Sequence, residues 1–324
     1  MNSSCPSCTA CEWFLVMQNE GMNFLLIPAV LLTTVTLVIN PLLLFCIFWS
    51  PSLRQETRYL LLANTLLSDI LFLIFNITNI SCNALGMEMH YIFCEFLMVA
   101  TVTTYCSSVL TVTLMVTDTF MAMRWPLRYS EILPLSRVKK IVALVWVIAM
   151  VYPLSLLVVM VVRKQGKTEN LKMCLVLLSL ASLEEDIEVS LHIYFSVWVI
   201  VCVVLILYCC IRLYMVTRSS GIWHSRYSRA RRTLLAHTMM LLIYFAPGLV
   251  FTVELAQFGE LSKNVHLAVW INTINLAVLM VVPRACAPYV YGLRYREVYE
   301  MVQLMVWKRW LSQHTNNSPT PTET

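Results

Sequence analysis

The run NFLLIPAVLLTTVTLVINPLLLFCIFW, residues 23–49, contains no Asp, Glu, Lys or Arg. A helix that crosses the hydrocarbon core of a bilayer, which is about 30 Å thick, needs about 20 consecutive and mostly apolar residues. Six further runs of this kind follow, at approximately residues 59–82, 91–121, 139–162, 187–216, 233–258 and 265–293. The sequence therefore predicts an all-α membrane protein, a bundle of seven transmembrane helices.

The overall composition excludes a soluble globular protein. Hydrophobic residues make up 59% of the 324 residues and charged residues 13%, whereas soluble proteins carry roughly 25% charged residues. No long polar linker and no internal repeat divides the sequence. We expect one domain over residues 23–293, preceded by an extracellular tail at residues 1–22.

The segment after the last run predicts a short surface helix. In residues 294–310, Val298, Met301, Val302, Met305 and Trp310 recur at three- and four-residue spacings, with charged residues between them. This pattern is typical of an amphipathic helix on the inner membrane surface. The polar segment 311–324 is expected to be a disordered cytoplasmic tail.

Positive charge lies mostly on one side of the predicted bundle. Outside the spans, only Arg163, Lys164, Lys167, Lys172 and Lys263 of the 23 Lys and Arg residues share a side with the amino terminus. Because cytoplasmic loops are enriched in Lys and Arg, this asymmetry predicts a multi-pass plasma-membrane protein with an extracellular amino terminus. The net charge of +5 is explained by this topology, without a nucleic-acid partner.

The amino-terminal tail holds two candidate modification sites. Cys5, Cys8 and Cys11 have a spacing that could suggest zinc, but in an oxidising compartment disulfides, within or between chains, are favoured. Asn2 begins the sequon Asn2-Ser3-Ser4, the glycosylation sequon that is clear of the predicted spans.

Polar residues inside the predicted spans form a second group of candidates. Asp69 lies in the second run and Arg284 in the seventh, while Asn40 and Ser108 lie in the first and third. Ionisable residues inside a bilayer are costly, and they usually face the bundle interior together with a partner. We expect these four residues to form one buried polar network.

An ordered set of motifs resembles the rhodopsin-type (class A) G-protein-coupled receptors over nearly the whole chain. Cys94 precedes Asp118 at the spacing that separates the family's disulfide cysteine from the acidic residue of its Asp-Arg-Tyr motif. The other matching segments are Asn40-Pro41, Leu66-Leu67-Ser68-Asp69, Trp146, Tyr208-Cys209-Cys210-Ile211, Tyr244-Phe245-Ala246-Pro247 and Ala287-Pro288-Tyr289-Val290-Tyr291. Each motif is weak alone, but their order and spacing make the resemblance specific.

The resemblance implies two links between distant parts of the chain. We expect a disulfide between Cys94 and Cys174, because both lie at the predicted outer surface. In the family, the face of the seventh helix that carries Arg284 points toward the second helix. We therefore expect a buried Arg284–Asp69 ion pair, in the place of the sodium ion that many members of the family hold at this aspartate.

The resemblance also implies heterotrimeric G protein and arrestin as partners at the inner end of the bundle. Activation and coupling are expected to involve Asp118, Thr119, Phe120, Tyr208, Pro247, Pro288 and Tyr291. Thr119 stands where the family has the arginine that helps to hold the inactive state and then contacts the G protein. Two interpretations remain: a receptor with a shifted activation balance, and a receptor-like or decoy protein that does not couple.

An unknown extracellular ligand is expected in the outer half of the bundle. If the resemblance holds, its pocket is lined by Thr101, Tyr105, His192, Ser196, Phe245, Leu249, Thr252, Glu254 and Thr273. Thr101 stands where amine receptors carry an aspartate, which disfavours an aminergic ligand. The acidic residues between 184 and 188 are either a solvated face or an attraction for a cationic peptide.

Other function classes have less support. Pro126-Leu127-Arg128-Tyr129 and Tyr291-Gly292-Leu293-Arg294 also resemble the odorant receptors of fish, which leaves an odorant-receptor-like chemosensor as an alternative. A transporter or channel usually has internal repeats, and this sequence has none. The sequence contains no metal-ligand spacing in its inner loops and no phosphate loop, so we expect no enzymatic activity and no cofactor.

Overall fold

The computed structural model describes residues 12–16, 23–125, 127–163, 170–171, 173–176, 228–257 and 264–294, with scattered positions between 193 and 215. Its long helices are α2 (Asn23–Trp49), α4 (Thr57–Ala84), α5 (Tyr91–Arg124), α7 (Leu135–Arg163) and α10 (Ser228–Ala256). A last span is built from α12 (Val265–Ile274), the π-helical segment η1 (Asn275–Leu279) and α13 (Val282–Arg294). Short helices α3 (Pro51–Arg54) and α6 (Tyr129–Ile132) lie in loops.

Six helices within these described residues are long and apolar enough to cross a membrane. Their bounds agree with six of the seven predicted runs to within a few residues. The fifth predicted run, 187–216, lies largely outside the described residues, although each position described between 193 and 215 is helical. The predicted surface helix, 294–310, and the tail after it lie outside the described residues except for Arg294.

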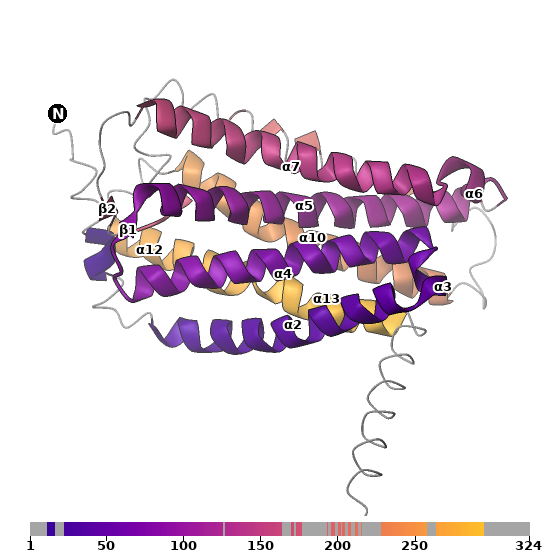
Figure 1. Cartoon of the computed structure of the whole chain (residues 1–324), viewed down its shortest axis with the longest axis horizontal. Coiled ribbons are helices and arrows are strands. Elements are labelled where there is room, and N and C mark those ends of the chain that lie inside the picture. The colour runs from indigo at the N-terminus through magenta and orange to yellow at the C-terminus, as the bar shows by residue number, and fades with distance from the viewer. Residues whose placement is uncertain are drawn as a thin grey trace, which may run out of the picture.

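The long helices run side by side as a bundle (Figure 1). Successive helices pack side by side from α2 to α4, α5 and α7, while α10 packs on α5 and α13, and α13 returns to α2. The outward faces of α2 and α7 expose large apolar side chains such as Leu31, Phe45, Val147 and Val158. An exposed apolar surface of this extent suits a surrounding of lipid.

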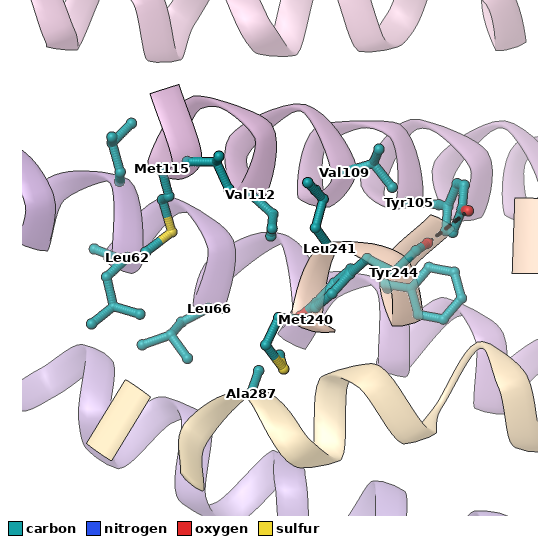
Figure 2. Packing of buried hydrophobic residues seen from close by; sticks show 14 of the residues in the cluster. Leu62, Leu66, Tyr105, Val109, Val112, Met115, Met240, Leu241, Tyr244 and Ala287 are labelled. Carbon is teal, nitrogen blue, oxygen red and sulfur yellow. Dashed lines mark hydrogen bonds between the residues drawn. The ribbon is translucent and has the colours of Figure 1, made fainter. Parts of the chain in front are cut away.

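Buried side chains from four helices meet along the axis of the bundle (Figure 2). Leu66 of α4, Val112 of α5, Leu241 of α10 and Ala287 of α13 belong to one cluster and are each at most 1% exposed. Their mutual burial holds the four helices at fixed separations. The cluster therefore packs α4, α5, α10 and α13 against one another.

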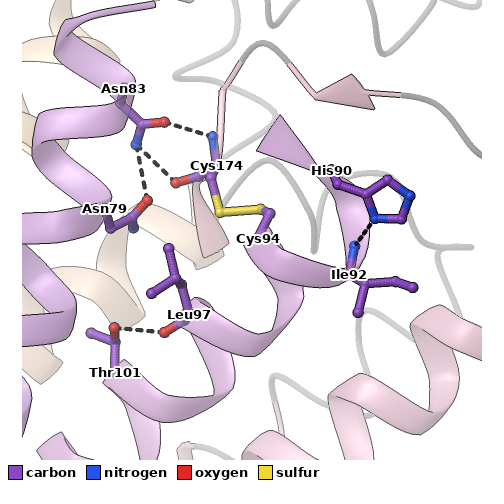
Figure 3. Close-up of a disulfide and its surroundings, with 8 residues drawn as sticks. All are labelled: Asn79, Asn83, His90, Ile92, Cys94, Leu97, Thr101 and Cys174. Atoms are coloured by element: carbon purple, nitrogen blue, oxygen red, sulfur yellow. Dashed lines mark hydrogen bonds between the residues drawn. A yellow bond between two sulfur atoms is a disulfide. The ribbon is translucent and has the colours of Figure 1, made fainter. Parts of the chain in front are cut away.

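One end of the bundle is tied by a disulfide between Cys94, at the start of α5, and Cys174, which confirms the predicted pairing. The amide of Asn83 in α4 brackets Cys174: its oxygen accepts from the backbone N–H at 2.8 Å, and its nitrogen donates to the carbonyl at 2.9 Å (Figure 3). Beside it, β1 (Met89–His90) pairs antiparallel with β2 (Asn170–Leu171). We call this the outer end, and the end with α3 and α6 the inner end.

The amino-terminal residues 12–16 pack into the outer end. Trp13 is 1% exposed and belongs to a cluster with Tyr152 of α7, Leu255 of α10 and Val269 of α12. The next residue, Phe14, lies against Gly86, where a Cβ atom would come within 2.8 Å of its ring. Gly86 has φ +63°, the left-handed conformation that commonly ends a helix, and it follows the carboxyl end of α4.

Candidate functional site

An ion pair lies in the middle of the bundle with no exposure to the surface. Asp69 of α4 and Arg284 of α13 are each 0% exposed, and Nε of Arg284 lies 3.4 Å from Oδ1 of Asp69. The geometry is the one expected from the sequence. An uncompensated charge at this depth would be severely destabilising, so each group is needed to keep the other charged.

Both carboxylate oxygens of Asp69 also accept a neutral hydrogen bond. The hydroxyl of Ser108 in α5 donates to Oδ1 at 2.9 Å, and the hydroxyl of Tyr244 in α10 donates to Oδ2 at 2.5 Å. Tyr105 of α5 in turn donates to the carbonyl oxygen of Tyr244 at 3.0 Å. Four helices, α4, α5, α10 and α13, therefore meet at a single carboxylate.

Aromatic faces surround the guanidinium of Arg284. Its central carbon lies 3.5 Å from the ring centroid of Phe72, 5.6 Å from that of Tyr105 and 5.7 Å from that of Tyr244. Cation–π attraction is strongest when the cation is desolvated, as it is here. The guanidinium also donates to the carbonyl oxygen of Met280, one turn earlier in the chain. We call Asp69, Arg284 and these three rings the central cluster.

One predicted member does not join this network. Asn40 of α2 is buried, but neither atom of its amide has a hydrogen-bond partner among the described residues. Asp69 already accepts from Ser108 and Tyr244 on both of its oxygens. The expectation that Asn40 belongs to the network is therefore wrong in this structure.

A cavity of about 70 Å³ lies between the central cluster and the outer end. Phe72, Tyr105 and Met280 belong to its lining, and they also contact the guanidinium of Arg284. Most of the other lining residues come from α4, α5, α10 and the π-helical part of the last span; they are Asn76, Asn79, Met98, Thr101, Val102, Tyr152, Leu175, Val176, Gly248, Phe251, Glu254, Asn272, Asn275 and Leu276. The cavity is thus the outer neighbour of the central cluster.

Three of the nine predicted ligand-binding residues line this cavity: Thr101, Tyr105 and Glu254. Ser196, Phe245, Thr252 and Thr273 are not among its described lining residues, and His192 lies outside the described residues. Leu249 is 48% exposed on the outward face of α10, so its predicted place in the pocket is wrong. A helix turns by about 100° per residue, which brings the neighbouring Gly248 to the cavity in its place.

At the inner end, the acidic residue of the expected motif contacts a tyrosine. The hydroxyl of Tyr129 in α6 donates to Oδ1 of Asp118 at 2.6 Å. Burial, followed by the hydrogen bond to Asp118, raises the pKa of Tyr129 above its ordinary value. The phenol therefore keeps its proton and remains a donor at neutral pH. Thr119 donates to the carbonyl oxygen of Met115 in its own helix at 2.8 Å and supplies no charge.

The remaining activation residues lie in separate places. The carbonyl oxygen of Pro247 accepts from the amide of Asn275 at 3.3 Å, which joins α10 to η1. The ring of Phe120 lies edge-on to that of Trp125, and Tyr208 is 55% exposed. Pro288 is buried in α13, and the side chain of Tyr291 lies outside the described residues. Asn2, Cys5, Cys8 and Cys11 also lie outside them.

Four asparagines of the cavity were missed by the sequence reasoning, although a signal for them exists. Asn76 and Asn79 are three residues apart in α4, and Asn272 and Asn275 are three residues apart in the last span. Such spacing places each pair on one face of a helix. Polar side chains inside a span usually face the interior, so the two pairs could have predicted this cavity.

Comparisons with known proteins agree with this architecture. The model of the family described as 7 transmembrane receptor (rhodopsin family) matches residues 39–291. The chain is also similar to a human protein described as probable G-protein coupled receptor 148, with 33% identity over 294 residues. That alignment covers 89% of this chain and 84% of the human protein. The family match covers the helices that hold the cavity and the central cluster.

Proposed function

This chain belongs to the rhodopsin family of seven-transmembrane receptors, and we propose that it carries an extracellular signal to heterotrimeric G proteins and arrestin from the plasma membrane. In this proposal the amino terminus is extracellular and the ligand enters the outer cavity. The inner end, with α6 and the basic loops, then faces the intracellular partner.

The observation that carries the proposal is the set of residues shared by the cavity and the central cluster. Phe72 and Tyr105 line the cavity on one side and contact the guanidinium of Arg284 on the other. A ligand shifts a conformational equilibrium only if it binds the two states with different affinity. A ligand that displaces either ring changes the surroundings of the buried charge, and this provides such a difference.

The central cluster also supplies the path to the inner end. Tyr244 joins α10 to Asp69, and the carbonyl oxygen of Pro247 joins α10 to Asn275 of η1. Pro247 has no backbone N–H and so removes one hydrogen bond from α10, and π-helical turns occur frequently at functional sites. Movement of α10 against α4 and the last span therefore exchanges a small set of hydrogen bonds, as a two-state switch requires.

A second candidate function rests on Thr119. This residue is uncharged and bonded to its own helix, so the arginine contact of the family is missing. A chain without that contact could bind a ligand and fail to couple, as a decoy does. We favour coupling, because the hydroxyl of Tyr129 donates to Asp118 and keeps the inner loop tied to α5.

The experiment measures basal second-messenger levels and arrestin recruitment in cells at matched surface expression. The variants are Thr119→Arg, which restores the family's residue, and Thr119→Val, which removes only the hydroxyl. We expect wild type and Thr119→Val to signal above mock-transfected cells, and Thr119→Arg to differ from both. If all three equal mock-transfected cells for every G-protein class and for arrestin, the decoy interpretation replaces ours.

A further inference from the structure

The lining of the outer cavity contains several hydrogen-bond acceptors that lack a donor. Oδ1 of Asn76, Oδ1 of Asn275 and both oxygens of Glu254 are buried and have no hydrogen-bond partner among the described residues. Buried polar atoms in native proteins are nearly always bonded, so each exception calls for an explanation. Four such oxygens on one cavity suggest that the missing donor belongs to a ligand.

The orientation of both amides is fixed by bonds on their nitrogen side. Nδ2 of Asn76 donates to the carbonyl oxygen of Leu276 at 3.2 Å, and Nδ2 of Asn275 donates to that of Pro247 at 3.3 Å. Exchanging oxygen and nitrogen in either amide would set two oxygens against each other. The atoms left for the cavity are therefore acceptors.

Glu254 adds an ionisable carboxyl group to these acceptors. Its side chain belongs to a residue that is 2% exposed, near the outer end of α10. No Lys, Arg or His is among the described residues that line the cavity. The amide nitrogen of Asn275 donates to Pro247, and its second N–H is a neutral donor near the Glu254 carboxyl, which supplies no positive charge. Burial disfavours the charged form of a carboxyl group that has no opposite charge beside it, and a cationic ligand would restore that charge by pairing with it.

The opposite side of the cavity is unsuited to a second cation. Beneath Phe72 and Tyr105 lies the guanidinium of Arg284, which repels positive charge and is itself paired with Asp69. Much of the remaining lining is apolar, including Met98, Val102 and Phe251. The cavity therefore has a polarity: acceptors at Glu254 and apolar or aromatic surface toward the centre of the bundle.

We propose that the outer cavity binds a small organic cation, whose ammonium or guanidinium group donates to Glu254, Asn76 and Asn275 and whose apolar body faces Phe72. This proposal rests on the proposed receptor function and names the chemical class of its ligand. Thr101 stands where amine receptors carry an aspartate, so the third span has no acidic residue at this position. In this cavity the acidic residue is Glu254, on α10. The volume of about 70 Å³ favours a compact cation over a large one.

The test is the thermal unfolding midpoint of the purified full-length receptor, titrated with probes of matched shape. Phenethylamine and phenylguanidine are the cations, 2-phenylethanol is the neutral isostere and phenylacetate is the anion. We expect the two cations to raise the midpoint in a saturable way and the other two to leave it unchanged. A shift of equal size with 2-phenylethanol would overturn the proposal, and this comparison needs no variant.

Substitutions then locate the charge. Glu254→Gln should weaken phenethylamine binding by about thirtyfold or more, because it removes one partner of a buried charge pair. Glu254→Lys should reverse the preference, so that phenylacetate raises the midpoint. The matched control is Glu95→Gln, which removes a buried carboxylate from the smaller neighbouring cavity and should leave the affinity unchanged. Unchanged affinity in Glu254→Gln would contradict the assignment.

The outcome is separable from the proposed function. If no cation shifts the midpoint while the cells still show basal second-messenger production, the ligand class is wrong and the receptor function stands. If the cations bind in the Glu254-dependent way while no signal reaches G protein or arrestin, the site is correct and the decoy function is favoured.

Discussion

Arg284 has three kinds of neighbour: the carboxylate of Asp69, the carbonyl oxygen of Met280 and the face of the Phe72 ring. No single one of them would compensate a fully buried guanidinium. The ion pair supplies charge, the carbonyl supplies an acceptor and the ring supplies a polarisable surface in place of water. The three neighbours therefore stabilise the buried guanidinium together.

The first prediction concerns the coupling between the two charges. Asp69→Asn and Arg284→Met should each lower stability by about 3 to 5 kcal/mol, because each leaves one buried charge unpaired. The double variant should lose less than the sum of the two. Ser108→Ala, which removes only a neutral donor to Asp69, is the control and should cost about 1.5 to 3 kcal/mol. Thermal midpoints of purified protein provide the measurement.

Two results would contradict the ion pair, one from these variants and one from a change of salt. Strictly additive losses would mean that Asp69 and Arg284 do not interact. A rise in the midpoint when sodium chloride replaces potassium chloride at the same concentration would mean that a sodium ion reaches Asp69. We expect the two salts to give the same midpoint, because the guanidinium already supplies the positive charge at this carboxylate.

The second prediction concerns the tyrosine at the inner end. Tyr129→Phe removes the donor to Asp118 and should destabilise the contact between α6 and α5 by about 1.5 to 3 kcal/mol, as is typical of a bond to a charged group. Because the pKa of Tyr129 is raised, the lost bond is one that wild type keeps at neutral pH. Amide hydrogen exchange should rise in residues 129–132. Tyr91→Phe, at the outer end, is the control and should leave this exchange unchanged. Equal exchange of residues 129–132 in wild type and Tyr129→Phe would contradict the bond between Tyr129 and Asp118.

At the scale of elements, the spans could be predicted from the sequence and the interruption of the last one could not. A long uncharged run such as residues 23–49 is decided by the thickness of a bilayer. The π-helical turn at Asn275–Leu279 depends on neighbours: Asn275 bonds to Pro247 of α10, and these residues are distant in sequence. A periodicity analysis of one segment contains no information about that contact.

The contact between α5 and α10 gives the third prediction. A Cβ atom at Gly248 would lie 2.6 Å from the hydroxyl oxygen of Tyr105, so Gly248→Ala must displace that hydroxyl. We expect a loss of about 1 to 3 kcal/mol, the usual range for overpacking. Tyr105→Phe, which removes the hydroxyl and its bond to Tyr244, should cost about 0.5 to 1.5 kcal/mol alone.

The double variant is the informative one. Gly248→Ala combined with Tyr105→Phe should be about as stable as Tyr105→Phe alone, because the group that the new methyl would strike is gone. Thermal midpoints of the four proteins measure the coupling. A double variant as unstable as the sum of both losses would show that α5 and α10 do not approach each other in this way.

For the whole molecule, the sequence predicted the buried ion pair better than it predicted which residues line the cavity. The ion pair was predictable, because two opposite charges inside spans have few other ways to be stable. The cavity was predicted in part: Glu254 and Tyr105 line it, whereas Leu249 faces outward and Phe72 was not considered. Lining residues depend on the rotation of each helix about its axis, and packing with the other helices sets that rotation.

The arrangement of the molecule along its length supports a signalling function. The outer end holds the disulfide and the cavity, the middle holds the central cluster, and the inner end holds the bond between Asp118 and Tyr129. Communication between two ends requires an element with two discrete arrangements. We expect the central cluster to be that element, because the carboxylate of Asp69 joins α4 to α13 through an ion pair and to α10 and α5 through hydroxyl donors.

The most direct test is receptor-dependent nucleotide exchange by purified G proteins, with the receptor reconstituted in lipid nanodiscs. Wild type is compared with Arg284→Met, which disrupts the central cluster, and with Leu249→Ala, which changes an outward-facing side chain. We expect exchange above the receptor-free background for at least one G-protein class, altered by Arg284→Met and unaltered by Leu249→Ala. Background exchange with every class, for wild type and both variants alike, would contradict it.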